Sequence, residues 1–198
     1  DPWNKWEKPL AMRNAKALEQ AFVRYAEDVE FYSVLQYWFY QQWGQLKAYC
    51  NSKGISIVGD IPIYVAYDSA DVWVHPELFQ LDEAQVPTAV AGCPPDVFSP
   101  TGQLWGNPLY DWEYHKKTGY AWWIHRLASA TELYDTVRID HFRGFESYYT
   151  VPYGRPTAEN GKWCKGPGIS LFEAAKKELG EISIIAEDLG FVTPEVRQ

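Results

Sequence analysis

The chain of 198 residues carries 26 acidic and 18 basic side chains, which gives a formal net charge of −8. Nucleic acids and anionic membranes bind basic surfaces, so this charge argues against both as partners. The sequence also shows neither a run of about 20 apolar residues that would cross a membrane nor a basic and apolar leader at its start.

Helical spacing of apolar residues marks the stretch 15–50. The acidic pair Glu27 and Asp28 suits the first turn of a second helix, so a break is predicted there. Gly54 suits the C-terminal end of that helix. The side chains that follow one another three or four positions apart on one helix face are Phe31, Leu35, Trp38, Gln42, Leu46 and Tyr49.

Three apolar runs rich in β-branched residues predict strands at 54–65, 134–142 and 182–190. Helical patterns follow the first two of these strands. They cover 113–130 and 168–179. Because near-continuous apolar strands alternate with helices, we expect parallel strands that are covered on both faces.

Two further signals concern helix ends. Gly180 is the expected stop of the helix 168–179. A last helix is predicted to begin in the segment "VTPEV", with Thr193 as its N-cap and Pro194 in its first turn.

Each predicted strand ends in a carboxylate: Asp60, Asp140 and the pair Glu187 and Asp188. Catalytic groups of (β/α)8 barrels lie at the C-terminal ends of strands, and ligands of open α/β sheets bind there as well. Three strands do not close a barrel of eight. We therefore expect an α/β fold in which residues 1–198 are part of one catalytic (β/α)8 TIM barrel, about strands three to five, rather than a small open sheet.

A long connection, 81–112, separates the first two strands. Its Pro, Gly, Asp and Asn content excludes a single regular element. It carries Phe98, Trp105, Tyr110 and Trp112, so disorder is not expected. Long ordered loops are usually functional, and this one is predicted to cover a substrate at the strand ends.

Aromatic residues make up 17% of the chain, including ten Trp. Trp and Tyr fill protein cores, and they also stack on the apolar faces of sugar rings. A neutral carbohydrate is therefore compatible with an acidic, Trp-rich chain. Composition alone does not choose between these two uses.

Asp140 and Glu187 are the natural catalytic pair, because they close consecutive strands. Retaining glycoside chemistry uses two carboxyl groups about 5–5.5 Å apart, one as nucleophile and one as acid/base. Arg138 lies on the same strand face as Asp140 and favours its ionised form. The apolar run before Glu187 predicts a buried carboxyl that keeps its proton, and His141 is expected to donate a hydrogen bond to a sugar hydroxyl.

The alternative is purely structural. Arg138 and Asp140 would then form a buried ion pair, and Glu187 and Asp188 would mark a strand end that reaches water. Other motifs carry no chemistry: "GPG" at 166–168 lacks the Lys and Ser/Thr of a phosphate loop, and no GxGxxG follows a strand.

Histidine and cysteine spacing does not indicate a metal site. The cysteines are odd in number and without CxxC spacing, so free buried thiols in a reducing, cytoplasmic compartment are expected. The residues concerned are His75, His115, His125, Cys50, Cys93 and Cys164.

Several stretches together resemble the 4-alpha-glucanotransferase family (amylomaltase, or disproportionating enzyme) of the alpha-amylase superfamily. The resemblance implies that Asp140 is the nucleophile and Glu187 the general acid/base, with Asp60, Arg138 and His141 beside the substrate. The matching stretches are "GDIPIYVAYDSADVWVHPELFQLD", "AGCPPDVFSPTGQLWGNPLYDW", "VRIDHFRGF", "TAENGKWCKGPG" and "IIAEDLG".

The resemblance further implies that Phe98, Gln103 and Trp105 lie on a substrate-covering loop. The implied reaction passes a segment of an alpha-1,4-glucan to the 4-hydroxyl of another glucan, with retention and without a metal or organic cofactor. Maltooligosaccharides are the implied partners. An alpha-amylase-type hydrolase and a non-catalytic glucan-binding module are the alternatives.

The sequence departs from the family pattern in two ways. The third carboxylate, an aspartate in a His-Asp motif, has no counterpart before Gln198, and the first barrel strands are missing. We therefore expect an internal fragment that is inactive without the remainder of its barrel. Val97 stands beside Phe98 where many relatives carry Tyr, which bears on product length.

Overall fold

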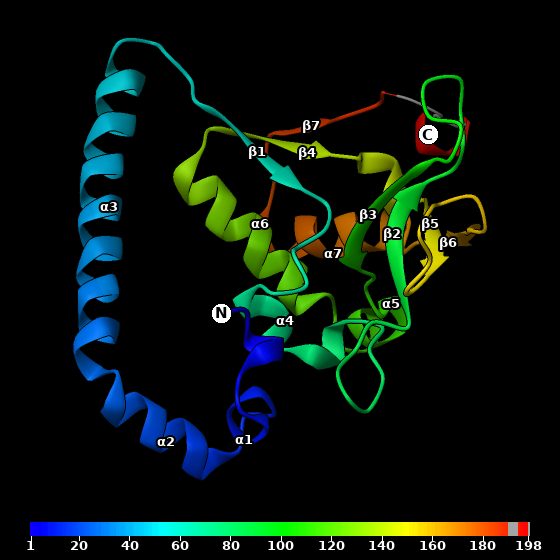
Figure 1. The fold of residues 1–198 in the computed structure, drawn as a ribbon. Helices are drawn as coiled ribbons and strands as arrows, with labels where there is room; N and C mark the ends of the chain where they lie inside the picture. Colours follow the sequence, from blue (N-terminus) through cyan, green and yellow to red (C-terminus); the bar gives the residue numbers. More distant parts are fainter. Residues whose placement is uncertain (190–193, 198) are drawn as a thin grey trace.

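The computed structural model describes residues 1–189 and 194–197, which form two β-sheets with helices around them (Figure 1). The parallel sheet has the order β1-β4-β7, and the antiparallel sheet has the order β3-β2-β5-β6. The strands are β1 (Val58–Pro62), β2 (Ala89–Cys93), β3 (Gln103–Pro108), β4 (Thr136–Asp140), β5 (Ser147–Pro152), β6 (Lys162–Lys165) and β7 (Ile184–Ala186).

Helices and short 3-10 turns connect these strands. None of the helices in the described part of the chain combines the length and the apolar character needed to span a bilayer. The elements are η1 (Trp3–Lys5), α1 (Lys8–Ala11), α2 (Ala15–Arg24), α3 (Ala26–Ser52), α4 (Ala70–Val74), η2 (Pro76–Leu78), α5 (Trp112–Lys117), α6 (Ala121–Leu133), η3 (Phe142–Phe145), α7 (Ile169–Leu179) and α8 (Pro194–Arg197).

The three predicted strands and their parallel arrangement are confirmed. The register of β1 and β4 runs from Val58 opposite Thr136 to Pro62 opposite Asp140. Each strand is shorter than its apolar run. Within β1, a Cβ atom at Gly59 would lie 2.0 Å from the ring of Tyr134, so the strand passes too close to that ring to carry a side chain there.

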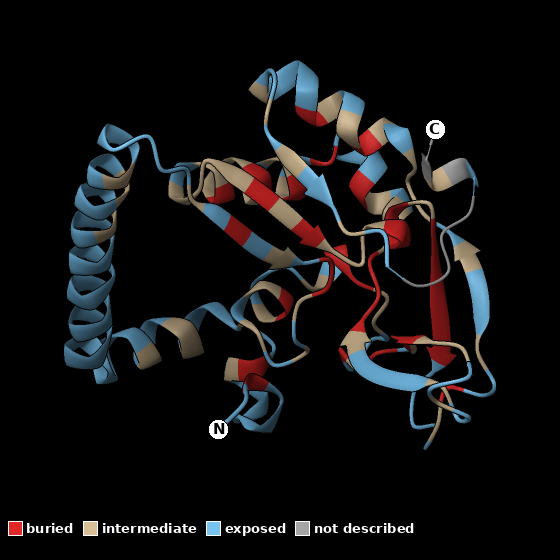
Figure 2. Cartoon of the chain, turned by 90° about the horizontal axis from the view of Figure 1, so that it is seen from above, coloured by how far each residue is buried: buried red, intermediate tan, exposed pale blue. Residues whose placement is uncertain are grey.

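The core lies between the parallel sheet and the helices α6 and α7. Figure 2 shows buried residues along β4 and on the faces of these helices that turn to it. Removing such apolar side chains from water is the main favourable contribution to folding. The fully buried members of this core include Trp123, Leu127, Val137, Ile139 and Leu171.

The antiparallel sheet corrects the prediction of a long loop at 81–112. Within that stretch β2 and β3 form a hairpin, and β5 and β6, which the sequence did not predict, extend the sheet. The hairpin turns tightly at Gly102, whose φ is +70° and where a Cβ would lie 2.4 Å from the Cys93 carbonyl oxygen. Residues 94–102 at the tip of the hairpin and 82–88 before β2 lie outside helices and strands.

The predicted helices are found, with two differences in their boundaries. The break expected at Glu27 and Asp28 falls at Tyr25, and the two acids lie in the first turn of α3. The stretch 113–130 divides into α5 and α6, because Gly119 and Tyr120 both have positive φ. Pro194 begins α8, whereas Thr193, its predicted cap, lies outside the described residues.

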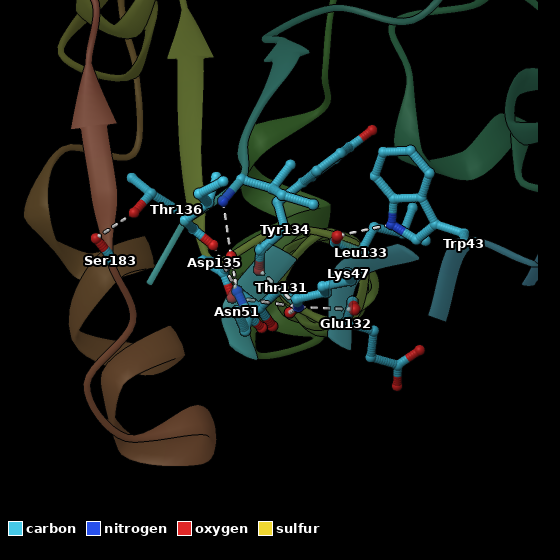
Figure 3. Close-up of polar contacts among 12 residues, drawn as sticks. Trp43, Lys47, Asn51, Thr131, Glu132, Leu133, Tyr134, Asp135, Thr136 and Ser183 are labelled. Carbon is cyan, nitrogen blue, oxygen red and sulfur yellow. Dashed lines mark hydrogen bonds and ion pairs between the residues drawn. The ribbon is translucent and has the colours of Figure 1, made fainter. Parts of the chain in front are cut away.

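The long helix α3 is joined to the body near its C-terminal end. Trp43 Nε1 donates to the Leu133 carbonyl oxygen at 2.8 Å. Lys47 Nζ donates to the carbonyl oxygens of Thr131, Glu132 and Tyr134 at 3.0–3.2 Å (Figure 3). These carbonyls end α6, where a cation also complements the helix dipole.

A second set of contacts fixes the N-terminal end of the parallel sheet. Asp135 Oδ2 accepts hydrogen bonds from the Ile57 amide at 2.7 Å and from Asn51 Nδ2 at 2.8 Å (Figure 3). These donors lower the pKa of Asp135, the Ile57 amide most strongly. Thr136 and Ser183 hydroxyls lie 3.0 Å apart and link β4 to the entry of β7.

We predict that Lys47→Met lowers the free energy of unfolding by about 1–2 kcal/mol, because three carbonyls at the end of α6 lose a charged donor. Chemical denaturation of the two proteins measures the difference. The matched control is Lys16→Met, which removes the same charge from an exposed position on α2. Equal losses in the two variants would contradict the assignment.

Candidate active site

A charged cluster lies where β1 and β4 end. Asp60 is opposite Arg138 in the register of the two strands, and Asp140 follows two residues later on the same face. Arg138 Nη1 donates to Asp60 Oδ1 at 2.7 Å, and Nη2 donates to Asp140 Oδ1 at 2.9 Å. One guanidinium therefore joins two carboxylates from neighbouring strands.

This cluster is open to solvent. The side chains of Asp60 and Asp140 are 59% and 49% exposed, so the alternative of a buried ion pair is wrong. The hydrogen bond with Asp60, followed by that with Asp140, raises the pKa of Arg138. The guanidinium is a permanent cation, and its fork geometry fixes the direction of both carboxylates.

Glu187 lies beside this cluster, just after β7. Its backbone amide donates to the Ile139 carbonyl oxygen at 3.1 Å, which continues the pairing of β4 with β7. Its Oε2 accepts from the His141 amide at 3.0 Å, and its Oε1 accepts from the Leu189 amide. Asp140 and Glu187 are therefore brought to neighbouring strand ends, as predicted.

The prediction that apolar residues enclose Glu187 is wrong. Ile185 and Ala186 are exposed and Glu187 itself is half-buried. Its contacts are with backbone N–H groups, those of His141 and Leu189. Asp188, the other member of the predicted pair, is exposed.

The ring of His141 packs between the two sheets. It meets Trp105 edge to face, with centroids 4.8 Å apart, and its Nε2 is buried with no hydrogen-bond partner in the described part of the chain. Burial, followed by the charge of Arg143, lowers its pKa to about 4. His141 is therefore neutral at pH 7, with a buried ring nitrogen that has no partner among the described residues.

The antiparallel sheet brings Trp105 to the end of the parallel sheet. Trp105 Nε1 donates to Gln103 Oε1 at 3.0 Å, so a hydrogen bond joins these two side chains of β3. Phe98 is 91% exposed at the hairpin tip. Asp96 Oδ1 holds that tip by accepting from the amides of Phe98 and Ser99, and the structure does not bring Phe98 into the cluster around His141.

Tyr64 is a residue of this site that sequence reasoning missed. It is buried, with its ring 6.5 Å from that of His141 and 6.3 Å from that of Trp105, and burial raises its pKa. Arg126 supports this segment by donating to the carbonyl oxygen of Pro62 at 2.7 Å. The available signal was an aromatic residue four positions after Asp60, just beyond the strand end.

The sequence predicted no metal site from the spacing of its other histidines and its cysteines. His115 is buried, its Nε2 lies 3.2 Å from the Leu78 carbonyl oxygen, and desolvation lowers its pKa to about 4. The cysteines are free as expected, but each is half-buried rather than fully buried.

Known proteins share both the sequence pattern and the fold of this chain. A profile of the 4-alpha-glucanotransferase family matches residues 1–198. A 4-alpha-glucanotransferase from Clostridium butyricum is 54% identical over 98% of this chain and 40% of its own length. One from Streptococcus pneumoniae is 56% identical over 98% and 39%. The structure of amylomaltase from Streptococcus agalactiae in complex with acarbose matches with a TM-score of 0.96 and 45% identity, covering 100% of this chain and 40% of that chain.

The fold is that of an α/β protein, and the candidate side chains meet at the carboxyl ends of its parallel strands. The profile match is narrower, and it confirms the expected family: the chain belongs to the 4-alpha-glucanotransferase family. It spans about two fifths of the length of the curated relatives it matches.

We predict that the free energy of unfolding falls as the pH is lowered from about 6.5 to about 4. The ordinary pKa of His is 6.5, and that of His141 in the folded protein is about 4, so the unfolded chain binds more protons within this window. Denaturation at several pH values should show a shallower slope for His141→Asn, since Asn tolerates positive φ. Asn at the exposed His125 controls for the loss of a histidine, and an unchanged slope in His141→Asn would contradict the account.

Proposed function

We propose that these residues form the donor site of a 4-alpha-glucanotransferase that works within a longer chain. The enzyme would transfer alpha-1,4-glucan segments to the 4-hydroxyl of another glucan, with retention. The observation that carries the proposal is the placement of Asp140, held by Arg138, beside Glu187 at adjacent strand ends. Two carboxyl groups side by side are what retaining chemistry requires.

In this reaction Asp140 attacks the anomeric carbon, and Glu187 gives its proton to the departing glycosidic oxygen. A covalent glucosyl-aspartate remains and the first glucan leaves with a free 4-hydroxyl. Glu187, now a carboxylate, then takes the proton from the 4-hydroxyl of the acceptor as that oxygen displaces Asp140. Both carboxyl groups end as they began.

The surrounding side chains support each step. Arg138 binds Asp140 through Oδ1, which leaves Oδ2 for the anomeric carbon. The unpartnered Nε2 of His141 suits a sugar hydroxyl. Trp105, exposed beside that ring, offers a flat apolar face on which a glucose unit can stack.

Transfer instead of hydrolysis needs an acceptor sugar where water would otherwise attack. We assign that role to the hairpin tip, where Val97 and Phe98 are both 91% exposed and Asp96 holds the turn. A prearranged apolar tip excludes water and binds an incoming glucan. Val97 offers a smaller surface than Tyr would, which bears on the preferred length of the product.

The proposed ligand class is alpha-1,4-glucans such as maltooligosaccharides. The Streptococcus agalactiae relative was solved in complex with acarbose, and this chain shares its backbone arrangement. We further propose that the parallel sheet is about strands three to five of a (β/α)8 barrel. The remaining strands and the third carboxylate would then lie outside these residues, and the three free thiols suit a reducing cytoplasm.

In a family-length polypeptide containing these residues, Asp140→Asn and Glu187→Gln should each reduce turnover of maltotriose at least about 1,000-fold. Chromatography of the products measures turnover and distinguishes the reactions. Glucose together with longer maltooligosaccharides indicates transfer, whereas glucose and maltose alone would indicate a hydrolase. Asp188→Asn, at the exposed neighbouring carboxylate, is the matched control. Wild-type turnover in both site variants would refute the assignment, and glucan binding without turnover would indicate a binding module.

Phe98→Ala should increase the share of product formed by hydrolysis, because the acceptor loses an apolar contact and water gains access. The ratio of free glucose to transferred glucose, measured from maltotriose, reports this share. Val97→Ala at the same tip separates loss of the ring from a general disturbance of the turn. A ratio that is unchanged in Phe98→Ala would remove the tip from the mechanism.

A further inference from the structure

A buried arginine lies next to the candidate active site. Arg143 is only 5% exposed, and it belongs to η3, the turn that follows β4 and His141. A guanidinium keeps its charge in proteins, so burying one is costly unless its contacts compensate for the lost water. The proposed reaction steps do not use this cation, although it lies three residues after Asp140 in the chain.

The guanidinium of Arg143 is held by two neighbouring strands of the antiparallel sheet. Its Cζ lies 3.9 Å from the ring centroid of Trp163 on β6, which is a cation–π contact. Its Nη2 donates to Ser147 Oγ on β5 at 2.8 Å. Ser147 Oγ in turn donates to Glu146 Oε2 at 2.5 Å, which brings a carboxylate into the same network. Arg143 therefore ties η3, at the end of the parallel sheet, to β5 and β6.

The turn that carries Arg143 is packed closely against the site. The Gly144 amide donates to the His141 carbonyl oxygen at 2.9 Å. A Cβ at Gly144 would lie 2.7 Å from Ile63 Cδ1 and 3.2 Å from Cδ2 of the His141 ring. Two amides of the segment "GPG", at 166–168, donate at 2.8 Å to carbonyl oxygens of this turn and of the residue after it. A shift of η3 would therefore be transmitted to the His141 ring.

The position of η3 matters because two groups of His141 take part in the site. The His141 amide donates to Glu187 Oε2 at 3.0 Å, and the His141 ring meets Trp105 with centroids 4.8 Å apart. A displaced turn would move both groups relative to Asp140. Misplacement by about 1 Å can lower the rate of an enzyme about 100-fold. The contacts of Arg143 therefore bear on the geometry of the proposed reaction.

The charge of Arg143 also acts on the His141 ring. Burial lowers the pKa of His141 most, the charge of Arg143 lowers it further, and Asp140 raises it. Carboxylates near a histidine favour its protonated form, and an imidazolium beside Asp140 would compensate its negative charge and make it a weaker nucleophile. The ionisable groups that face His141 are Asp140 on β4, Arg143 on η3, Tyr64 after β1 and Glu187 after β7.

We propose that Arg143 is a positioning residue of the transfer reaction, whose buried guanidinium fixes the turn that carries the His141 ring and amide. It acts through His141 and not by touching the glucan. The proposal rests on the proposed function, because it concerns the same site. Lys in place of Arg143 would keep the charge but lack the flat, forked head that stacks on Trp163 and binds Ser147. Met would remove both the charge and the fork.

Titration of His141 in the family-length polypeptide tests the proposal without any turnover. Histidine labelled with carbon-13 at Cε1 is followed by NMR, and the His141→Asn variant identifies the signal. In Arg143→Met the midpoint of His141 should rise from about 4 toward the ordinary 6.5, whereas in Arg143→Lys it should stay near the wild-type value. Arg155→Met, which removes an arginine from an exposed loop position, is the matched control. A wild-type midpoint in folded Arg143→Met would overturn the proposal.

Turnover of maltotriose is the second readout. Arg143→Met should lower kcat about 100-fold with little change in KM, since a displaced His141 affects the transition state more than binding. Arg143→Lys should recover part of that loss, and Arg155→Met should match the wild type. Wild-type kcat in Arg143→Lys would overturn the proposal, and this variant decides if Arg143→Met does not melt cooperatively. A wild-type parent that transfers no glucan would instead refute the proposed function, while the titration still reports on Arg143.

Discussion

The bridge that Arg138 forms between Asp60 and Asp140 is the interaction on which the site depends. Two carboxylates at the ends of adjacent parallel strands repel each other, and a guanidinium between them converts that repulsion into attraction. The bridge also requires one register, because Asp60 must lie opposite Arg138. The register of β1 and β4 therefore also sets the direction of the proposed nucleophile, because it places Arg138 within reach of both carboxylates.

The two ends of the parallel sheet differ in the contacts that their side chains make. At the N-terminal end, Lys47 and Asp135 connect α3, α6 and the entries of the strands through hydrogen bonds to the backbone. At the C-terminal end, charged groups remain exposed, and the antiparallel sheet adds Trp105 beside His141. In (β/α)8 barrels the C-terminal ends of the strands carry the catalytic groups and the opposite face serves stability, and the proposed site lies at the C-terminal ends.

The sequence predicted the strands that carry Asp60 and Asp140 and the strand that directly precedes Glu187, because β-branched runs that end in a charge are a strong local signal. It did not predict the antiparallel sheet, since "AVAGC" and "QLWGNP" are rich in small residues, Gly and Pro and resemble loops. The sequence also could not predict the surroundings of Glu187. They depend on backbone amides, those of His141 and Leu189, that meet the carboxylate only in the folded chain, and amino-acid composition does not show where a backbone amide points.

The central claim, that Asp140 held by Arg138 is the attacking carboxylate, is tested most directly by trapping the intermediate. The family-length polypeptide would be treated with a fluorinated maltosyl fluoride, whose glycosyl-enzyme breaks down slowly, and then digested for mass spectrometry. The account predicts loss of the anomeric fluoride and one fluoromaltosyl unit on the peptide that contains Asp140, attached to that side chain. Attachment to Asp60 or Glu187, or turnover of the reagent with no labelled peptide, would contradict it.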